Sequence, residues 1–110
     1  MITAIDRRTG GDRRAAPRYV LRLAVEWETA GGKKSGTVND ISREGCFVLC
    51  SGEVDDGMLV ALYFPLNEGG RIEFMCEVTN HTYEIGFGVR FSGLSFAQRE
   101  YLSKLIGSLR

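Results

Sequence analysis

Short stretches of this 110-residue chain alternate apolar and polar residues with a period of two, and this feature constrains the fold most. The alternation runs through residues 19–28, 71–78 and 85–92. A strand with this period points one row of side chains at a core and the other row at water. The pattern therefore predicts three half-buried strands, and Trp27 is expected to lie in the core. The apolar members of the three rows are Leu21, Leu23, Val25 and Trp27; Ile72, Phe74, Cys76 and Val78; and Ile85, Phe87, Val89 and Phe91.

Turn-forming residues divide the rest of the chain into three more strands. Connections are expected at residues 30–33, 55–57 and 65–70, each of which contains glycine. Asn80 and His81 are expected to break the strand that starts at residue 71. The three additional strands are expected at residues 35–41, 46–50 and 58–64.

The end of the chain carries the pattern of a helix. Ser95 and Gln98 form a capping box, and apolar residues follow at helical spacing. A helix over about residues 95–108 should therefore cover an end or a flank of the sheet. Six short strands and one helix indicate a small antiparallel barrel or sandwich, and residues 19–110 suffice for one domain with one core. The apolar helix positions are Tyr101, Leu102, Leu105, Ile106 and Leu109.

Residues 1–18 show no hydrophobic periodicity and are expected to form a flexible basic arm. Five arginines against two aspartates give this segment a net charge of +3, whereas the remaining residues carry −3. A basic arm on a mildly acidic body suits a small anionic ligand better than a long nucleic acid. Asp-Arg-Arg occurs at residues 6–8 and again at 12–14. Either this repeat is chance, or Arg8 belongs to a second set of guanidinium groups for the same ligand.

Two short motifs carry the chemistry that points to a ligand. Arg13, Arg14 and Arg18 form an RRxxxR segment, in which Pro17 keeps the backbone extended or turned. Arginine forks bind phosphates and purine edges, and guanidinium planes stack on bases. A DxSxxG segment follows at residues 40–45, and its carboxylate can accept hydrogen bonds from the ring N–H and exocyclic amine of guanine. Together the motifs describe a receptor for a small, doubly charged ligand that carries guanine.

The fixed positions of the second motif are Asp40, Ser42 and Gly45. Asp40 and Ser42 alternate along the chain, so an extended stretch would direct both side chains to one face. The same residue types are also ordinary turn residues that bond the local backbone. Gly45 is expected to permit a close backbone approach.

In the order of its motifs the chain resembles the PilZ domain, a small bacterial β-barrel that binds cyclic di-GMP. The resemblance covers about the whole chain, including a Gly-x-Gly-x-x-Phe segment at residues 86–91 and a closing helix. It implies a mainly β fold, with a six-stranded antiparallel barrel between the arm and the helix. In that family a double arginine can accompany binding of a stacked ligand dimer, so one or two ligands, and a monomer or a ligand-bridged dimer, remain open. The residues that the resemblance assigns to cyclic di-GMP are Arg13, Arg14, Arg18, Asp40, Ser42 and Gly45.

Gly86 and Gly88 are additional candidates for the site. They alternate with the apolar row of their strand, and a glycine there lets another group lie close to the sheet. That group is either a guanine ring or the C-terminal helix.

Other classes of function find little support. No signal-peptide core and no apolar run of about 20 residues is present, so the cytoplasm is the expected compartment. Cys46 and Cys50 are too far apart along one strand for an unstrained disulfide, and the three cysteines and His81 lack the spacing of a metal site. No nucleophile is paired with a base. Neither catalytic residues, nor a metal, nor a cofactor is therefore predicted, and His81 is expected to have a surface role.

The predicted receptor is expected to signal to a downstream partner protein, which the sequence does not identify. Ligand binding would order the arm over the barrel and create the surface that this partner reads. One alternative is an interaction module with the same barrel and no ligand. Its candidate interaction surfaces would be the C-terminal helix and the strand at 58–64. That strand is apolar on both faces, so both faces are expected to be covered. Binding of single-stranded nucleic acid through the arm is a weaker alternative, because the polar faces lack aromatic residues.

Overall fold

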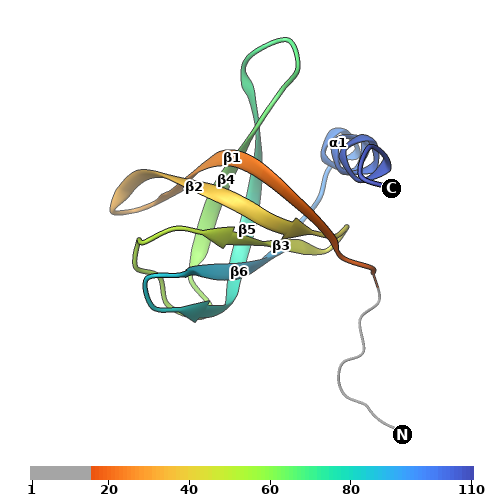
Figure 1. Cartoon of the computed structure of the whole chain (residues 1–110). Helices are drawn as coiled ribbons and strands as arrows, with labels where there is room; N and C mark the ends of the chain where they lie inside the picture. The colour runs from red at the N-terminus through yellow and green to blue at the C-terminus, as the bar shows by residue number, and fades with distance from the viewer. Residues whose placement is uncertain (1–15) are drawn as a thin grey trace, which may run out of the picture.

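The computed structural model of the chain describes residues 16–110, which contain six strands and one helix. The elements are β1 (Tyr19–Thr29), β2 (Gly32–Ile41), β3 (Gly45–Leu49), β4 (Leu59–Pro65), β5 (Arg71–Thr82), β6 (Gly86–Phe91) and α1 (Phe96–Gly107). The strands form a closed barrel in the order β1-β2-β3-β6-β5-β4, with every neighbouring pair antiparallel (Figure 1). The predicted mainly β fold, six-stranded antiparallel barrel and C-terminal helix are thereby confirmed.

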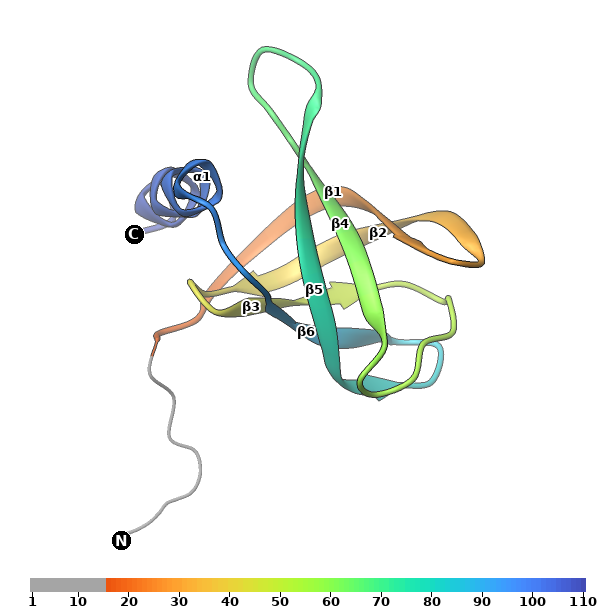
Figure 2. The same ribbon diagram turned by 180° about the vertical axis from the view of Figure 1, so that it is seen from behind.

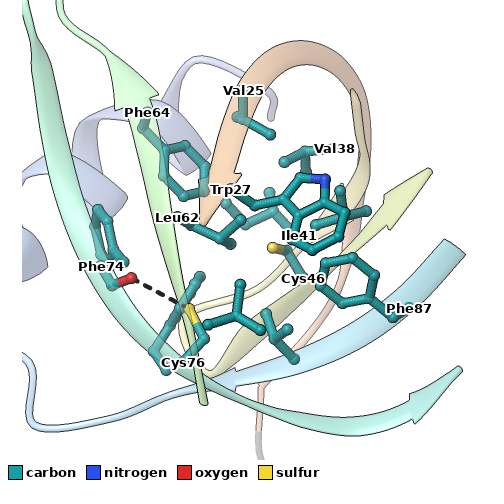
Figure 3. Packing of buried hydrophobic residues seen from close by; sticks show 14 of the residues in the cluster. Val25, Trp27, Val38, Ile41, Cys46, Leu62, Phe64, Phe74, Cys76 and Phe87 are labelled. Atoms are coloured by element: carbon teal, nitrogen blue, oxygen red, sulfur yellow. Dashed lines mark hydrogen bonds between the residues drawn. The ribbon is translucent and has the colours of Figure 1, made fainter. Parts of the chain in front are cut away.

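The interior of the barrel is filled by the apolar rows that the alternation predicted, with one exception described below (Figure 3). Trp27 is fully buried and packs edge-on against Phe87, with the ring centroids 5.0 Å apart. Its indole Nε1 donates a hydrogen bond of 3.3 Å to Ser35 O, which satisfies the one polar atom of the ring. Cys46 and Cys76 are buried in the same core, and both are free thiols.

The helix α1 lies at one side of the barrel beside the β4–β5 hairpin (Figures 1 and 2). The predicted capping box is present, because Ser95 Oγ accepts the Gln98 N–H and the Gln98 side chain accepts the Ser95 N–H. Gln98 Nε2 also donates to Glu73 O over 2.7 Å, and the Tyr101 hydroxyl donates to Pro65 O over 2.8 Å. These bonds tie the helix to the hairpin. The buried residues of the helix are Leu102 and Ile106. Within residues 16–110, no helix is long and apolar enough to cross a membrane.

Strand β5 differs from the prediction, because it continues through Asn80 and His81. Its ladder with β6 shifts by one residue between Val78 and Asn80. The additional residue, Thr79, forms a β-bulge. The strand therefore continues past the point where the alternation breaks, instead of ending there. His81 lies at the surface as predicted, with its Nδ1 2.8 Å from Asp56 Oδ1.

Two apolar residues expected to be covered are exposed. Ile85 belongs to the β5–β6 turn rather than to the core row, and 53% of its surface is exposed. Its N–H bonds Thr82 O over 3.0 Å, which fixes it in the turn. Leu59, the first residue of β4, is 64% exposed, so the outer face of this strand is not covered at that end. Strand β2 is also longer than predicted, since it begins at Gly32 directly after a tight turn.

Candidate ligand-binding site

A row of directly opposed residues crosses the outer face of four strands. Asp40 of β2 pairs with Phe47 of β3, Phe47 pairs with Gly88 of β6, and Gly88 pairs with Asn80 of β5. Opposed residues in an antiparallel sheet project from the same face. These four residues, which we call the cross-strand row, therefore present a carboxylate at one end, a carboxamide at the other, and a floor between them.

Two β-bulges decide which residues form the ends of the row. The β2–β3 register shifts between Val38 and Asp40, and the β5–β6 register shifts between Val78 and Asn80. A bulge inserts one residue into a strand and redirects the side chains beyond it. Had both ladders continued without a shift, the residues just before Asp40 and Asn80 would oppose the floor instead. The bulges thus give the row its two polar ends.

Arg18 meets Asp40 at the start of β1. The Arg18 Nε donates to Asp40 Oδ1 over 2.9 Å, and Nη2 of the same guanidinium contacts the same oxygen. The two side chains are 33% and 27% exposed, so the ion pair is partly shielded from water. Figures 1 and 2 show the segment that leads into β1 beside the β2–β3 turn, which explains how residues of the two motifs meet.

An open hollow of about 270 Å³ lies over the cross-strand row. Arg18 and Asp40 line one side, and Thr79 and Asn80 line the other. Its rim carries a cation, a carboxylate, a hydroxyl and a carboxamide, which suits a flat polar ligand that offers both donors and acceptors. The full lining consists of Arg18, Asp40, Cys46, Phe47, Thr79, Asn80, Gly88 and Val89.

Gly88 contributes no side chain to the floor of the hollow, and the Asn80 carboxamide lies above it. A Cβ atom at this position would lie 3.1 Å from both Nδ2 and Oδ1 of Asn80. The neighbour of Gly88 on this face is therefore Asn80, and the alternative that Gly88 accommodates the C-terminal helix is wrong. Gly86 serves another purpose: its Cβ would lie 2.1 Å from Val48 O, and the residue lines a different hollow beside His81.

Ser42 and Gly45 build the β2–β3 turn rather than the hollow. The Ser42 hydroxyl accepts hydrogen bonds from the N–H groups of Glu44 and Gly45, over 3.0 and 3.3 Å, and Ser42 is 2% exposed. The expectation that Ser42 and Asp40 present their side chains together is therefore not met, because the turn takes up the hydroxyl. Gly45 permits a close approach as predicted, since a Cβ there would lie 2.0 Å from Val89 O.

Cys46 contributes a buried thiol to the lining. Burial raises the pKa of this thiol well above its usual value, and the charges of Cys76 and Asp40 raise it further, whereas Arg18 lowers it. At neutral pH the group is therefore an uncharged thiol and a poor nucleophile. It packs as part of the core beneath the hollow.

Some predicted site residues fall outside the described part of the chain. Arg8, Arg13 and Arg14 precede residue 16. Conversely, the motifs did not identify Thr79 and Asn80, because their place in the hollow depends on a bulge. The only signal for them in the sequence is the interruption of the alternation after Val78, which by itself predicts the end of a strand.

Comparison with known proteins places this geometry in a family. A family model described as the PilZ domain matches residues 12–108. The PilZ domain of YcgR from Escherichia coli, solved with c-di-GMP, has a TM-score of 0.74 and 18% identity, over 89% of this chain and 92% of that chain. The PilZ domain of CeSA from a cellulose-synthesizing bacterium has a TM-score of 0.67 and 18% identity, over 84% and 97%. The MrkH–c-di-GMP complex from K. pneumonia has a TM-score of 0.71 and 20% identity, over 89% and 52%.

No curated protein sequence matches the chain significantly. The family model nevertheless spans most of its length, and the solved structures share its fold. The chain therefore belongs to the PilZ domain family.

Proposed function

We propose that the chain is a receptor for cyclic di-GMP that acts by binding and not by catalysis. Its family supports this proposal, as do the similar structures of YcgR and MrkH with c-di-GMP. The observation that carries the proposal is the Arg18–Asp40 ion pair beside the hollow. This pair joins one residue of the RxxxR motif to one residue of the DxSxxG motif.

Arg18 and Asp40 complement different parts of the ligand. A carboxylate has acceptor sites on both oxygens, so Asp40 can bond Arg18 and still accept the ring N–H and the exocyclic N–H of a guanine. The Arg18 guanidinium can stack on that base or donate to a phosphate. Because the two side chains already contact each other, binding needs to order neither of them.

The other arginines of the proposed site are Arg13 and Arg14, with Arg8 as a further candidate. We propose that they contact the phosphates when residues 1–15 close over the ligand. Ordering these residues costs about 1–2 kcal/mol of backbone entropy each, and charge-assisted bonds to two phosphates offset part of that cost. If Arg13 serves a second ligand, two ligands bind per chain or bridge two chains.

Three further residues support the site through the backbone. Ser42 and Gly45 contribute the turn that follows Asp40, and Gly88 contributes a floor position without a side chain, over which the Asn80 carboxamide lies. Gly86 is not included, because it lies outside the hollow.

The proposed output is a contact with a partner protein. The closed arm and the bound ligand together would form a surface that is absent without ligand, and the partner would recognise that surface. We propose the cytoplasm as the compartment, since the three cysteines are free thiols and reducing conditions preserve them.

A second candidate function is a ligand-independent protein-interaction module. A groove of about 620 Å³ runs between α1 and the β4–β5 hairpin and is lined in part by Ile72, Tyr101 and Leu105. Phe96, at the start of α1, is 75% exposed. These apolar groups offer a surface to another protein whether or not a nucleotide is bound.

Isothermal titration calorimetry with cyclic di-GMP tests the primary proposal, with GMP and cyclic di-AMP as controls. Saturable binding of cyclic di-GMP alone is expected. The stoichiometry shows whether one or two ligands bind per chain. If two bind, Arg13→Ala should reduce the number to one. Arg14→Ala should weaken binding by more than about tenfold, because it removes charge-assisted bonds. Absence of binding heat, together with unchanged NMR resonances of the arm, would reject the receptor and favour the interaction module.

A further inference from the structure

We propose that Asn80 contacts the bound guanine directly, at the edge of the ring that carries N7. The inference rests on the proposed function, because it requires a guanine in the hollow. It adds a ligand contact from β5, a strand to which neither the RxxxR nor the DxSxxG motif contributes.

Asn80 lies across the hollow from Asp40. Asn80 and Asp40 are the two ends of the cross-strand row, three strand spacings apart. At 4.7–4.9 Å per spacing, their Cα atoms are about 14 Å apart. The two side chains and a hydrogen bond of about 3 Å on each side take up most of this distance, so the remaining space admits one ring system and not two. Phe47 and Gly88 lie beneath it, and the Asn80 carboxamide lies over the Gly88 end of this floor, where it faces the edge of a base placed over Phe47.

The carboxamide of Asn80 is available for a ligand because another residue secures the bulge. Thr79 Oγ1 donates to Gly88 O across the ladder over 3.3 Å. Among the described residues, the Asn80 side chain makes one long hydrogen bond, from Nδ2 to Thr79 Oγ1 over 3.4 Å, and it is exposed. Both of its polar atoms nevertheless lie over Gly88, 3.1 Å from where a Cβ of that residue would stand, so the group is held within the hollow.

The two ends of the row match two edges of guanine. The ring N1–H and the 2-amino group are donors, and they suit the Asp40 carboxylate. The five-membered ring on the other side carries N7, an acceptor, which suits the Nδ2 donor of Asn80. Asp40 then discriminates against adenine, which lacks both donors, while Asn80 adds affinity and fixes the orientation of the base.

The test combines Asn80→Ala with a ligand that lacks N7. Dissociation constants are measured by calorimetry for the wild type and the variant, with cyclic di-GMP and with its 7-deaza analogue. The wild type should bind the analogue about three- to tenfold more weakly, the size of one hydrogen bond. Asn80→Ala should bind the two ligands equally. Asn67 is an exposed asparagine in the β4–β5 loop, and Asn67→Ala is the matched control. It should keep the wild-type ratio of the dissociation constant of the analogue to that of cyclic di-GMP.

A second variant tests the direction of the hydrogen bond. Asn80→Asp presents an acceptor to N7 and should bind cyclic di-GMP more weakly than Asn80→Ala. Equal or tighter binding by Asn80→Asp, or a wild-type ratio in Asn80→Ala, would overturn the role of Asn80 and leave the receptor intact. A wild type that binds no cyclic di-GMP would remove both proposals at once.

Discussion

Arg18 holds Asp40 through a single carboxylate oxygen, with Nε 2.9 Å from Oδ1 and Nη2 in contact with the same atom. A guanidinium often pairs with a carboxylate through two parallel bonds that occupy both oxygens. Here no hydrogen bond from residues 16–110 reaches Oδ2. The pair therefore fixes the carboxylate in place and leaves an acceptor for a third group, which is the arrangement that a base-reading residue requires.

This relationship predicts that Arg18 and Asp40 act as a unit. Arg18→Ala and Asp40→Ala should each weaken cyclic di-GMP binding by more than about tenfold, because each removes charge-assisted bonds and releases its partner. The double variant should lose less than the product of the two single losses, since the residues are in contact. Calorimetry on the four proteins checks this. Arg99→Ala, an exposed arginine on α1, controls for the change in net charge, and strictly multiplicative losses would contradict the coupling.

Gly88→Ala should impair binding and spare the fold. The added Cβ would lie 3.1 Å from the Asn80 carboxamide, whose flexible end can move, so the stability should stay within about 1 kcal/mol of the wild type. The methyl group would occupy the floor of the hollow, and we expect the affinity to fall roughly 5- to 100-fold. Gly107→Ala, which meets no atom within 4 Å, is the control. Unchanged affinity in a folded Gly88→Ala protein would show that the base does not lie on this floor.

Ser42→Ala and Gly45→Ala should act first on stability. Removing the Ser42 hydroxyl leaves the N–H groups of Glu44 and Gly45 without their acceptor, at a cost of about 1–3 kcal/mol. A Cβ on Gly45 would collide with Val89 O and force β3 from β6, at a cost of at least about 1–3 kcal/mol. Urea denaturation measures both effects. A Ser42→Ala protein with wild-type stability but no ligand binding would instead indicate a direct contact to the ligand.

The barrel could be predicted from the sequence because apolar and polar residues alternate with a period of two along several of its strands. The rows through Trp27 and Phe74 lie in the core as expected, and the capping box at Ser95 begins the helix. The errors occur where local pattern and tertiary structure diverge. Ile85 continues an alternating row but belongs to a turn, and Asn80 looks like a strand breaker but lies beyond a bulge in a continuous strand.

Only those site residues that belong to a recognisable sequence motif could be predicted. Arg18 and Asp40 were expected to share a ligand, and the structure brings them into contact. The role of Thr79 in closing the hollow depends on the register between β5 and β6, which residue type alone does not reveal. Ser42 belongs to a motif but does not line the hollow. A hydroxyl next to a turn can bond either a ligand or the local backbone, and the buried Ser42 hydroxyl bonds the backbone.

The buried cysteines predict that stability falls at alkaline pH. Burial raises the pKa of Cys76 to about 12, whereas a thiol in the unfolded chain ionises near 9.0. Above about pH 9 the unfolded state therefore releases a proton that the folded state retains, and the free energy of unfolding decreases as pH rises. Below about pH 9 the thiol is protonated in both states, and its contribution to the free energy of unfolding is fully present. Urea denaturation under reducing conditions between about pH 8 and pH 10 should show a steeper decline for the wild type than for Cys76→Ala, which lacks this thiol and in which the pKa of Cys46 is raised less. Equal slopes in the two proteins would mean that the Cys76 thiol ionises as readily in the folded barrel as in the unfolded chain.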